Sequence, residues 1–181
     1  MDPRVIRTRK MLIDALIELV IEKGYEPVTV RDIVVRAHIN RSTFYLHFQD
    51  KKDILDEMTN EVLTDLKQSM ANPPAFNLTD AMKDFRVLNK PIESAVKLFS
   101  HVQNYSALYA KMLPEVHFRD QVLRTIKNQL PSTPTEEIVI DFVTNGIVGI
   151  MLYWLNNGMK ESVEEISLEQ TKLALAIESF K

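Results

Sequence analysis

Apolar residues recur every three or four positions along most of this chain, and no stretch alternates strictly between apolar and polar residues. This spacing predicts amphipathic helices rather than strands. The first helix is expected over about 3–23, with Asp2 as its cap, Pro3 in its first turn and Gly24 at its end. Its apolar stripe consists of Ile6, Ile13, Leu16, Ile17 and Val20.

Capping residues mark the next three helices. Thr29 with Asp32, and Asp50 with Asp53, place a hydroxyl or carboxylate at a helix start and a carboxylate three residues later. Asn40 is another residue of the N-cap type. We therefore predict helices over about 30–37, 41–48 and 51–70. The first two are short and separated by three residues, which is the arrangement of a helix-turn-helix motif.

The remainder of the chain also has helical patterning. Only four glycines occur in 181 residues, fewer than the turns of a sheet protein of this size usually need, so the predicted fold class is all-α. Further helices are expected over about 78–88, 91–112, 115–129, 134–157 and 163–180. We divide the chain into a helix-turn-helix domain at 1–50, a connecting helix at 51–70 and a C-terminal helical bundle at 71–181.

Charge is distributed unevenly between the two ends. Residues 1–52 carry ten Lys or Arg and seven Asp or Glu, a net charge of +3, whereas the rest carry twelve and eighteen, a net charge of −6. A basic N-terminal third on an acidic remainder indicates different partners for the two parts. The lack of cysteine excludes disulfides and thiolate metal sites and fits the cytoplasm. We expect no membrane partner, since the apolar run 147–155 is far shorter than about 20 residues.

The helix expected over 41–48 has two different faces. Phe44 and Phe48 are four residues apart and share the face that packs on the first two helices. The other face carries Ser42, Thr43, Tyr45, Leu46 and His47. Hydroxyl groups and tyrosine bind phosphates, and an aliphatic side chain suits a thymine methyl group. Lys51, with the N–H groups that begin the next helix, can hold another phosphate, so we predict contact with double-stranded DNA.

Residues 5–56 resemble the DNA-binding domain of the TetR/AcrR family of transcriptional regulators. The resemblance is carried by Lys23-Gly24-Tyr25, by residues 28–33 (VTVRDI), by Ala37 and by residues 42–55 (STFYLHFQDKKDIL). It implies that four residues hold the DNA backbone or the floor of the major groove, namely Thr43, Tyr45, His47 and Lys51. It implies base contacts from Arg41, Ser42 and Leu46, and a phosphate contact from Thr29.

Other basic residues match weaker features of the family. Arg31 and Arg36 are additional candidates for DNA contact, and Arg4 and Arg7 resemble a basic N-terminal arm. Each assignment has a plainer alternative. Tyr45 can simply lie on the surface, and a histidine at a helix end, such as His47, can satisfy a carbonyl group. Arg4, Arg7, Arg9 and Lys10 can form a solvated face, and we assign His38 to the turn.

A single short helix in one major groove is too small to select a DNA site, and helix-turn-helix proteins solve this by pairing. The helix over 134–157 is the best candidate surface because it keeps Gly146 and Gly149, although glycine in a helix costs about 1 kcal/mol relative to alanine. The glycines indicate close approach of another backbone, either in a partner or within one subunit. The family resemblance also implies a homodimer formed through the last two helices. The predicted interface residues are Val143, Gly146, Ile147, Gly149, Ile150, Trp154, Leu173 and Ile177.

The resemblance further implies a ligand that enters the C-terminal part and shifts the fourth helix. Small-molecule sites mix apolar bulk with a few polar groups, which guides the choice of candidate residues. They are Phe85, His101, Tyr105, Tyr109, Met112, His117, Phe118 and Trp154. The alternative is that these aromatic and methionine side chains are ordinary core.

The predicted function is a homodimeric, cytoplasmic, DNA-binding transcriptional regulator. We expect a repressor that binds a palindromic operator and is released by a small-molecule effector of unknown identity. The alternative is a TetR-like coregulator that binds another protein and has lost operator binding. We find no hydrolase, phosphate-loop or metalloprotease motif, and the four histidines are scattered, so we predict no catalytic residues, no metal and no cofactor.

Overall fold

The computed structural model describes residues 2–71, 85, 87–130 and 137–178, apart from the side chains of 177 and 178. The chain divides into two compact units, Met1–Val62 and Leu63–Lys181, which we call unit 1 and unit 2. Every regular element in the described residues is an α-helix, so the predicted all-α fold class is confirmed. The division falls within α4 (Lys51–Met70), the helix that we predicted as a connection between two domains.

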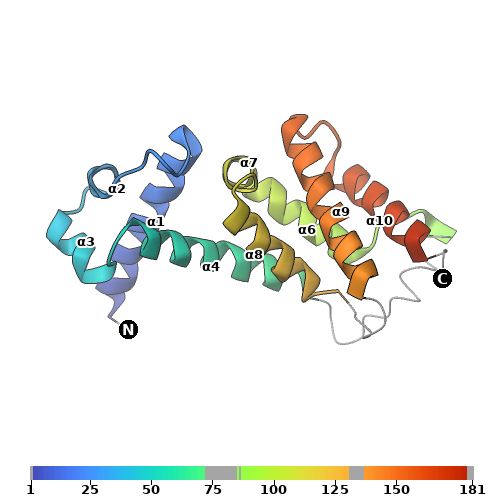
Figure 1. The fold of residues 1–181 in the computed structure, drawn as a ribbon, viewed down its shortest axis with the longest axis horizontal. Helices are drawn as coiled ribbons and strands as arrows, with labels where there is room; N and C mark the ends of the chain where they lie inside the picture. The colour runs from blue at the N-terminus through green and yellow to red at the C-terminus, as the bar shows by residue number, and fades with distance from the viewer. Residues whose placement is uncertain (1, 72–84, 86, 131–136, 179–181) are drawn as a thin grey trace. The chain divides into compact units, whose positions relative to one another are not determined.

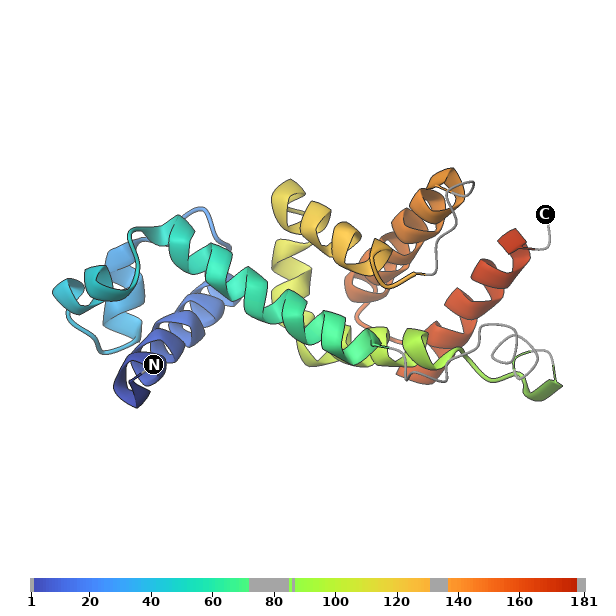
Figure 2. The ribbon, with the colours of Figure 1, turned by 90° about the horizontal axis from the view of Figure 1, so that it is seen from below.

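Unit 1 begins with α1 (Pro3–Lys23), α2 (Val30–Arg36) and α3 (Arg41–His47), which lie together in both ribbon views (Figure 1 and Figure 2). These bounds, and those of α4, agree with the predicted ranges to within one residue. The capping residues explain this agreement. Asp2 accepts the Arg4 N–H at 2.8 Å, and Asp50 accepts the N–H groups of Lys52 and Asp53 at 2.7 and 2.8 Å. Gly24 closes α1 at φ 77°, a left-handed conformation that suits glycine.

The turn between α2 and α3 contains a left-handed residue that is not glycine. His38 has φ 55°, and the N–H of Ile39 donates to the carbonyl of Val34 at 2.9 Å. This six-to-one hydrogen bond is the Schellman pattern that ends many helices. The predicted turn role of His38 is therefore confirmed. The Asn40 side chain, which we predicted as a cap, occupies the N-cap position of α3 but makes no capping hydrogen bond.

The core of unit 1 is formed where α1, α2 and α3 pack on one another. Phe44 and Phe48 are 0% and 2% exposed, and their ring centroids are 5.8 Å apart, which confirms that both belong to the core. The buried residues around them include Leu12, Leu16, Val20, Ile33, Ile54 and Met58. Because its buried side chains come from four helices, this core fixes the direction in which α3 presents its other face.

Unit 2 contains the end of α4 and five further helices in the described residues. They are α6 (Glu93–Asn104), α7 (Ser106–Met112), α8 (Val116–Lys127), α9 (Glu137–Asn156) and α10 (Val163–Glu178). The prediction of one helix over 91–112 is wrong, because the chain breaks at Tyr105, with φ −108° and ψ 22°. No proline or glycine marks this break. The helix predicted over 78–88 falls mostly outside the described residues.

Helices of unit 2 pack in two groups that share α9. α10 packs against α6 and α9, and α8 and α7 pack against α9 (Figure 1). The α10 side of the first contact is polar as well as apolar, since Ser167 and Thr171 are both fully buried. Thr171 Oγ1 accepts the N–H of Ile92 at 3.1 Å, which ties α10 to the chain just before α6. The spacing of apolar residues along the chain does not predict this polar contact.

The α9 helix combines a buried face with an exposed apolar face. Ile140, Ile147, Met151 and Trp154 point inward, whereas Ile138 and Phe142 are 86% and 66% exposed. Among the described residues α9 is the one helix long and apolar enough to cross a membrane by length and composition, and one third of its apolar window is buried. The apolar stretch is thus longer than the run 147–155 that we singled out. Core helices of soluble proteins meet the same two criteria.

Candidate nucleic-acid interface

The outward face of α3 is polar and well exposed. Arg41 and Ser42 are exposed, Tyr45 and Leu46 are 49% and 82% exposed, and Thr43 and His47 are half-buried. Phe44 lies on the opposite face with its ring edge-on to Tyr45, at a centroid distance of 5.4 Å. The seven-residue helix therefore brings together the six side chains that we predicted for DNA contact.

Arg41 and Tyr45 form a pair on this face. The guanidinium donates from Nη2 to the Tyr45 hydroxyl at 3.2 Å and lies 5.6 Å from the ring centroid. Residues four apart on a helix are neighbours, so the spacing of these two residues produces the contact. The pair orients a cation and a hydroxyl side by side before any partner binds.

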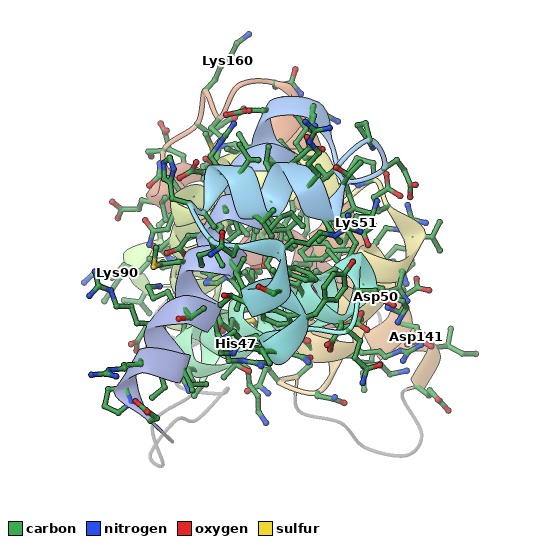
Figure 3. All side chains as sticks on the ribbon, turned by 90° about the vertical axis from the view of Figure 1, so that its left-hand side faces the viewer. His47, Asp50, Lys51, Lys90, Asp141 and Lys160 are labelled. Atoms are coloured by element: carbon green, nitrogen blue, oxygen red, sulfur yellow. The ribbon has the colours of Figure 1, made fainter. Side chains whose placement is uncertain are left out.

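Lys51 is more engaged within the protein than we expected. Its ammonium donates to the carbonyls of Tyr25 and Glu26 at 3.3 and 3.1 Å and lies 4.1 Å from the Tyr25 ring centroid. The Tyr25 hydroxyl donates in return to the Lys51 carbonyl at 3.4 Å, and burial is the main cause that raises the pKa of Tyr25. An ammonium group has three donors, so one donor is available beyond these two contacts. Figure 3 shows His47, Asp50 and Lys51 along the chain from the end of α3 to the start of α4.

One part of the Lys51 hypothesis is wrong. We expected free N–H groups at the start of α4 to help hold a phosphate. The N–H groups of Lys52 and Asp53 instead donate to the Asp50 carboxylate, which caps the helix and places a negative charge there. A phosphate contact by the Lys51 side chain stays a prediction.

The start of α2 is closed by the predicted capping box. Thr29 Oγ1 accepts the Asp32 N–H at 3.2 Å, and the Asp32 carboxylate accepts the Thr29 N–H at 2.9 Å. Hydrogen bonds from Thr29, and then the ammonium of Lys23, lower the pKa of Asp32 to about 2. Thr29 and Arg31 are exposed. Arg36 is held by Glu18 and Glu22 on α1, at 3.0 and 2.7 Å, so its guanidinium is already paired and we do not propose it as a DNA contact.

Arg9 is a residue whose contacts we did not predict. We grouped it with a solvated face, yet its guanidinium reaches His47, Phe48 and Glu57. A signal was available, because position 9 lies three and four residues before the buried Leu12 and Ile13 and so continues their stripe. Arg4 and Arg7 on the same helix are exposed, in agreement with a solvated face or an arm.

The predicted ligand-contacting residues fall into separate places in unit 2. His101, Tyr105, Tyr109 and Phe118 make one aromatic cluster, with ring centroids 4.8 to 5.8 Å apart. Met112 and Trp154 are buried, and Phe85 is half-buried. His117 is exposed and hydrogen-bonded to Gln121 at 2.8 Å, so the structure does not bring it into the cluster.

The cluster contains a chain of polar contacts. His101 Nδ1 lies 3.2 Å from the carboxylate of Asp65 on α4, and His101 Nε2 lies 3.2 Å from the Tyr109 hydroxyl. Burial lowers the pKa of His101, and Asp65 partly opposes this effect. Burial also raises the pKa of Tyr109. The imidazole is therefore neutral near pH 7, which lets Nδ1–H donate to Asp65 while Nε2 accepts from Tyr109.

The predicted interface residues lie on α9 and α10, and those on α9 are split between its two faces. Gly146 and Gly149 are exposed, and a Cβ atom added to either would meet none of the described residues within 4 Å. Close packing against the described part of the same chain therefore does not explain these glycines. Val143 and Ile150 are half-buried, and Leu173 on α10 is 55% exposed. Ile147 and Trp154 lie in the core of unit 2, and the side chain of Ile177 is outside the described residues.

Family models match most of the chain in two parts. The model for bacterial regulatory proteins of the tetR family matches residues 12–58, and a model for a transcriptional regulator C-terminal region matches residues 89–175. Over 172 residues the chain is 25% identical to the HTH-type transcriptional regulator YxbF of Bacillus subtilis, with 93% of this chain and 44% of YxbF covered. The alignments span between 29% and 63% of the four curated relatives.

Solved structures show the same fold at low sequence identity. A tetR-family transcriptional regulator from Streptomyces coelicolor has a TM-score of 0.75 at 17% identity, covering 99% of this chain and 83% of that one. The transcriptional regulator FadR from Bacillus subtilis, in complex with stearoyl-CoA, has a TM-score of 0.63 at 21% identity, covering 92% and 97%. An N-terminal helix-turn-helix followed by an all-α C-terminal region defines a class of transcriptional regulators. This chain belongs to the tetR family of bacterial regulatory proteins.

Proposed function

We propose that this chain is a homodimeric transcriptional regulator that binds a palindromic DNA operator. The observation that carries the proposal is the outward face of α3, where cationic, hydroxyl and aliphatic side chains lie together above a phenylalanine core. Leu46 at 82% exposure has little use in a solvated helix, but an aliphatic group at this place suits a thymine methyl. A helix with this face is suited to the major groove of DNA.

Each side chain has a proposed role that follows from its chemistry. Side chains that contact phosphates position the protein, and those that contact base edges give specificity. The proposed base contacts are Arg41, Ser42 and Leu46. The proposed contacts to the DNA backbone are Thr29, Arg31, Thr43, Tyr45, His47 and Lys51.

The exposed face of α9 supports the homodimer. Ile138, Phe142 and Tyr153 are all more than half exposed on this face, which also carries Gly146 and Gly149. An apolar face with open space over its glycines fits the close approach of a second copy of α9. Val143, Ile150, Leu173 and Ile177 are proposed to extend this interface. Two copies would present two α3 helices to half-sites about 34–36 Å apart.

We further propose that the regulator is a repressor and that a small molecule bound in unit 2 releases it. FadR, which has the same fold, is in complex with stearoyl-CoA. The cluster of His101, Tyr105, Tyr109 and Phe118 mixes apolar rings with polar groups, as small-molecule sites do. Met112, Trp154 and Phe85 are the other candidates, and His117 is the weakest because it is exposed and hydrogen-bonded to Gln121.

The decisive experiment is selection of bound fragments from a random pool of duplex DNA. We expect a palindrome with half-sites one helical turn apart, which would test DNA binding and pairing together. Lys51→Ala should weaken binding to every duplex and reduce the salt dependence of affinity, because the ammonium neutralises a phosphate. Tyr45→Ala should also weaken binding to every duplex but leave the salt dependence unchanged, because a tyrosine hydroxyl carries no charge. Arg41→Ala should instead relax preference at one base position by about 1–3 kcal/mol. If the wild-type chain binds no duplex at low salt, the coregulator alternative replaces this proposal.

A further inference from the structure

Arg9 joins three helices of unit 1 through one side chain. From α1 its Nη1 donates to the carbonyl of His47, the last residue of α3, at 2.7 Å. Its Nε donates to Glu57 Oε1 on α4 at 2.9 Å, and its Nη2 donates to Oε2 of the same carboxylate. The guanidinium also lies 4.4 Å from the ring centroid of Phe48. All four residues lie within unit 1.

The chemistry of the guanidinium fits this position. Its planar fork binds a carboxylate through two parallel N–H groups and leaves another N–H group for a third acceptor. The last carbonyls of a helix have no partner within the helix, and a positive charge near them is favourable. A lysine ammonium would keep the charge but would lose the two-point contact with Glu57. The site therefore uses the shape of arginine and not only its charge.

We propose that Arg9, oriented by Glu57, is a positioning residue that sets the orientation of α3 for reading DNA without touching DNA itself. This inference rests on the proposed function. Arg9 and Glu57 side chains keep 26% and 29% exposure, and partly exposed ion pairs contribute little to folding stability. The fully buried Phe44, Ile54 and Met58 hold the fold together independently of this pair. Side chains that recognise a ligand must be held to within about 0.5 Å, so a small shift of α3 matters more for recognition than for stability.

Two conservative substitutions test the proposal on DNA that the wild-type chain selects from a random duplex pool. Arg9→Lys keeps the charge, and we expect about tenfold weaker binding of the selected duplex, with little change for a scrambled duplex. The slope of log affinity against log salt should stay at the wild-type value, since Arg9 neutralises no phosphate. Glu57→Gln removes a negative charge, which by electrostatics alone would strengthen DNA binding. If Glu57 orients Arg9, Glu57→Gln should weaken binding of the selected duplex instead. The variant that carries both substitutions should lose no more affinity than either single variant.

Matched controls separate positioning from stability and from charge. Arg36→Lys breaks another arginine fork in unit 1, to Glu18 and Glu22 on α1, that does not touch α3. Asp56→Asn makes the same charge change as Glu57→Gln, one residue earlier on α4, at a carboxylate paired with Lys52. Neither control should weaken selected-duplex binding. Without DNA, amide hydrogen exchange should quicken in α3 of the Arg9→Lys variant, while exchange in α2 stays unchanged.

Two results would overturn the proposal. One is selected-duplex binding at wild-type strength in both Arg9→Lys and Glu57→Gln. The other is a loss in Arg36→Lys as large as the loss in Arg9→Lys, which would assign the effect to general weakening of unit 1. In either case the wild-type chain would still select a duplex, so DNA binding itself would stand. A wild-type chain that selects no duplex would instead remove both the proposed function and this inference.

Discussion

Unit 1 and unit 2 both have a buried apolar core, but they differ in the side-chain contacts that link their helices around it. In unit 1 charged side chains link helices through Arg9 with Glu57 and Arg36 with Glu22. Lys51 links the start of α4 to the carbonyls of Tyr25 and Glu26, between α1 and α2. In unit 2 a charged pair, Lys127 with Asp141, also joins α8 to α9, but the largest buried side chain, Trp154, packs edge-on against Phe99. The difference teaches that the exposed side of unit 1 is shaped by polar contacts, whereas unit 2 depends on how well its interior is filled.

The largest expected effect concerns the interior of unit 2. Trp154 is fully buried, packs edge-on against Phe99 at a centroid distance of 5.6 Å, and donates its indole N–H to the Glu161 carbonyl at 2.9 Å. Trp154→Ala should destabilise unit 2 by about 3–5 kcal/mol because it leaves a cavity and an unpaired carbonyl. Chemical denaturation followed by circular dichroism measures this change.

The control for this substitution is Val116→Ala at the start of α8, where the side chain is 61% exposed. Surface substitutions of this kind usually change stability by less than about 0.5 kcal/mol. Equal losses for the two variants would show that unit 2 does not depend on its interior as described.

A smaller effect is expected at the exposed face of α9. Phe142 is 66% exposed in the single chain, and in the proposed homodimer both copies would be covered. Phe142→Glu should cost about 2 kcal/mol per copy, which corresponds to about a thousandfold weaker dimer. Analytical ultracentrifugation over a range of concentrations measures this. Val35→Glu, at a 65% exposed residue of α2, should leave the assembly unchanged. A Phe142→Glu chain that stays dimeric at the lowest concentration would move the interface elsewhere.

The smallest effect is a pH dependence that belongs to unit 2. Burial holds the pKa of His101 below its usual value, so the folded chain binds fewer protons there than the unfolded chain does. The stability of unit 2 is therefore fully present above about pH 6.5 and decreases as the pH falls below that value. The fluorescence of Trp154, the only tryptophan, reports unfolding of this unit.

Three substitutions test whether His101 causes this pH dependence. His101→Gln should remove the decrease below about pH 6.5, while His117→Gln, at an exposed residue, should keep it. Asp65→Asn should make the decrease larger, because Asp65 opposes the lowering of the His101 pKa. An unchanged pH profile in His101→Gln would assign the effect to another group.

The sequence predicts those features of each unit that depend on residues close together in the chain. Capping residues such as Thr29 with Asp32, and the apolar stripe of α1, act within a few residues, so the bounds of α1 to α4 could be read directly. The outward face of α3 also follows from helical spacing. The stripe of α1 indicates that Arg9 lies beside the core, but its partners could not be predicted, because they are residues 38 and 48 positions away. The break at Tyr105 has no proline or glycine, and only the packing of α6 and α7 shows it.

The sequence by itself determined that this chain is helical, that it carries a helix-turn-helix, and which residues of α3 face outward. These properties depend on local spacing and capping, which act over one or two helical turns. Tertiary structure decided which charged side chains are already paired, such as Arg36 and Lys51, and that Trp154 is core while the face of Phe142 is open. The physical reason is that charge pairing and side-chain burial depend on which helices pack together, and contacts between residues far apart in the chain determine that packing.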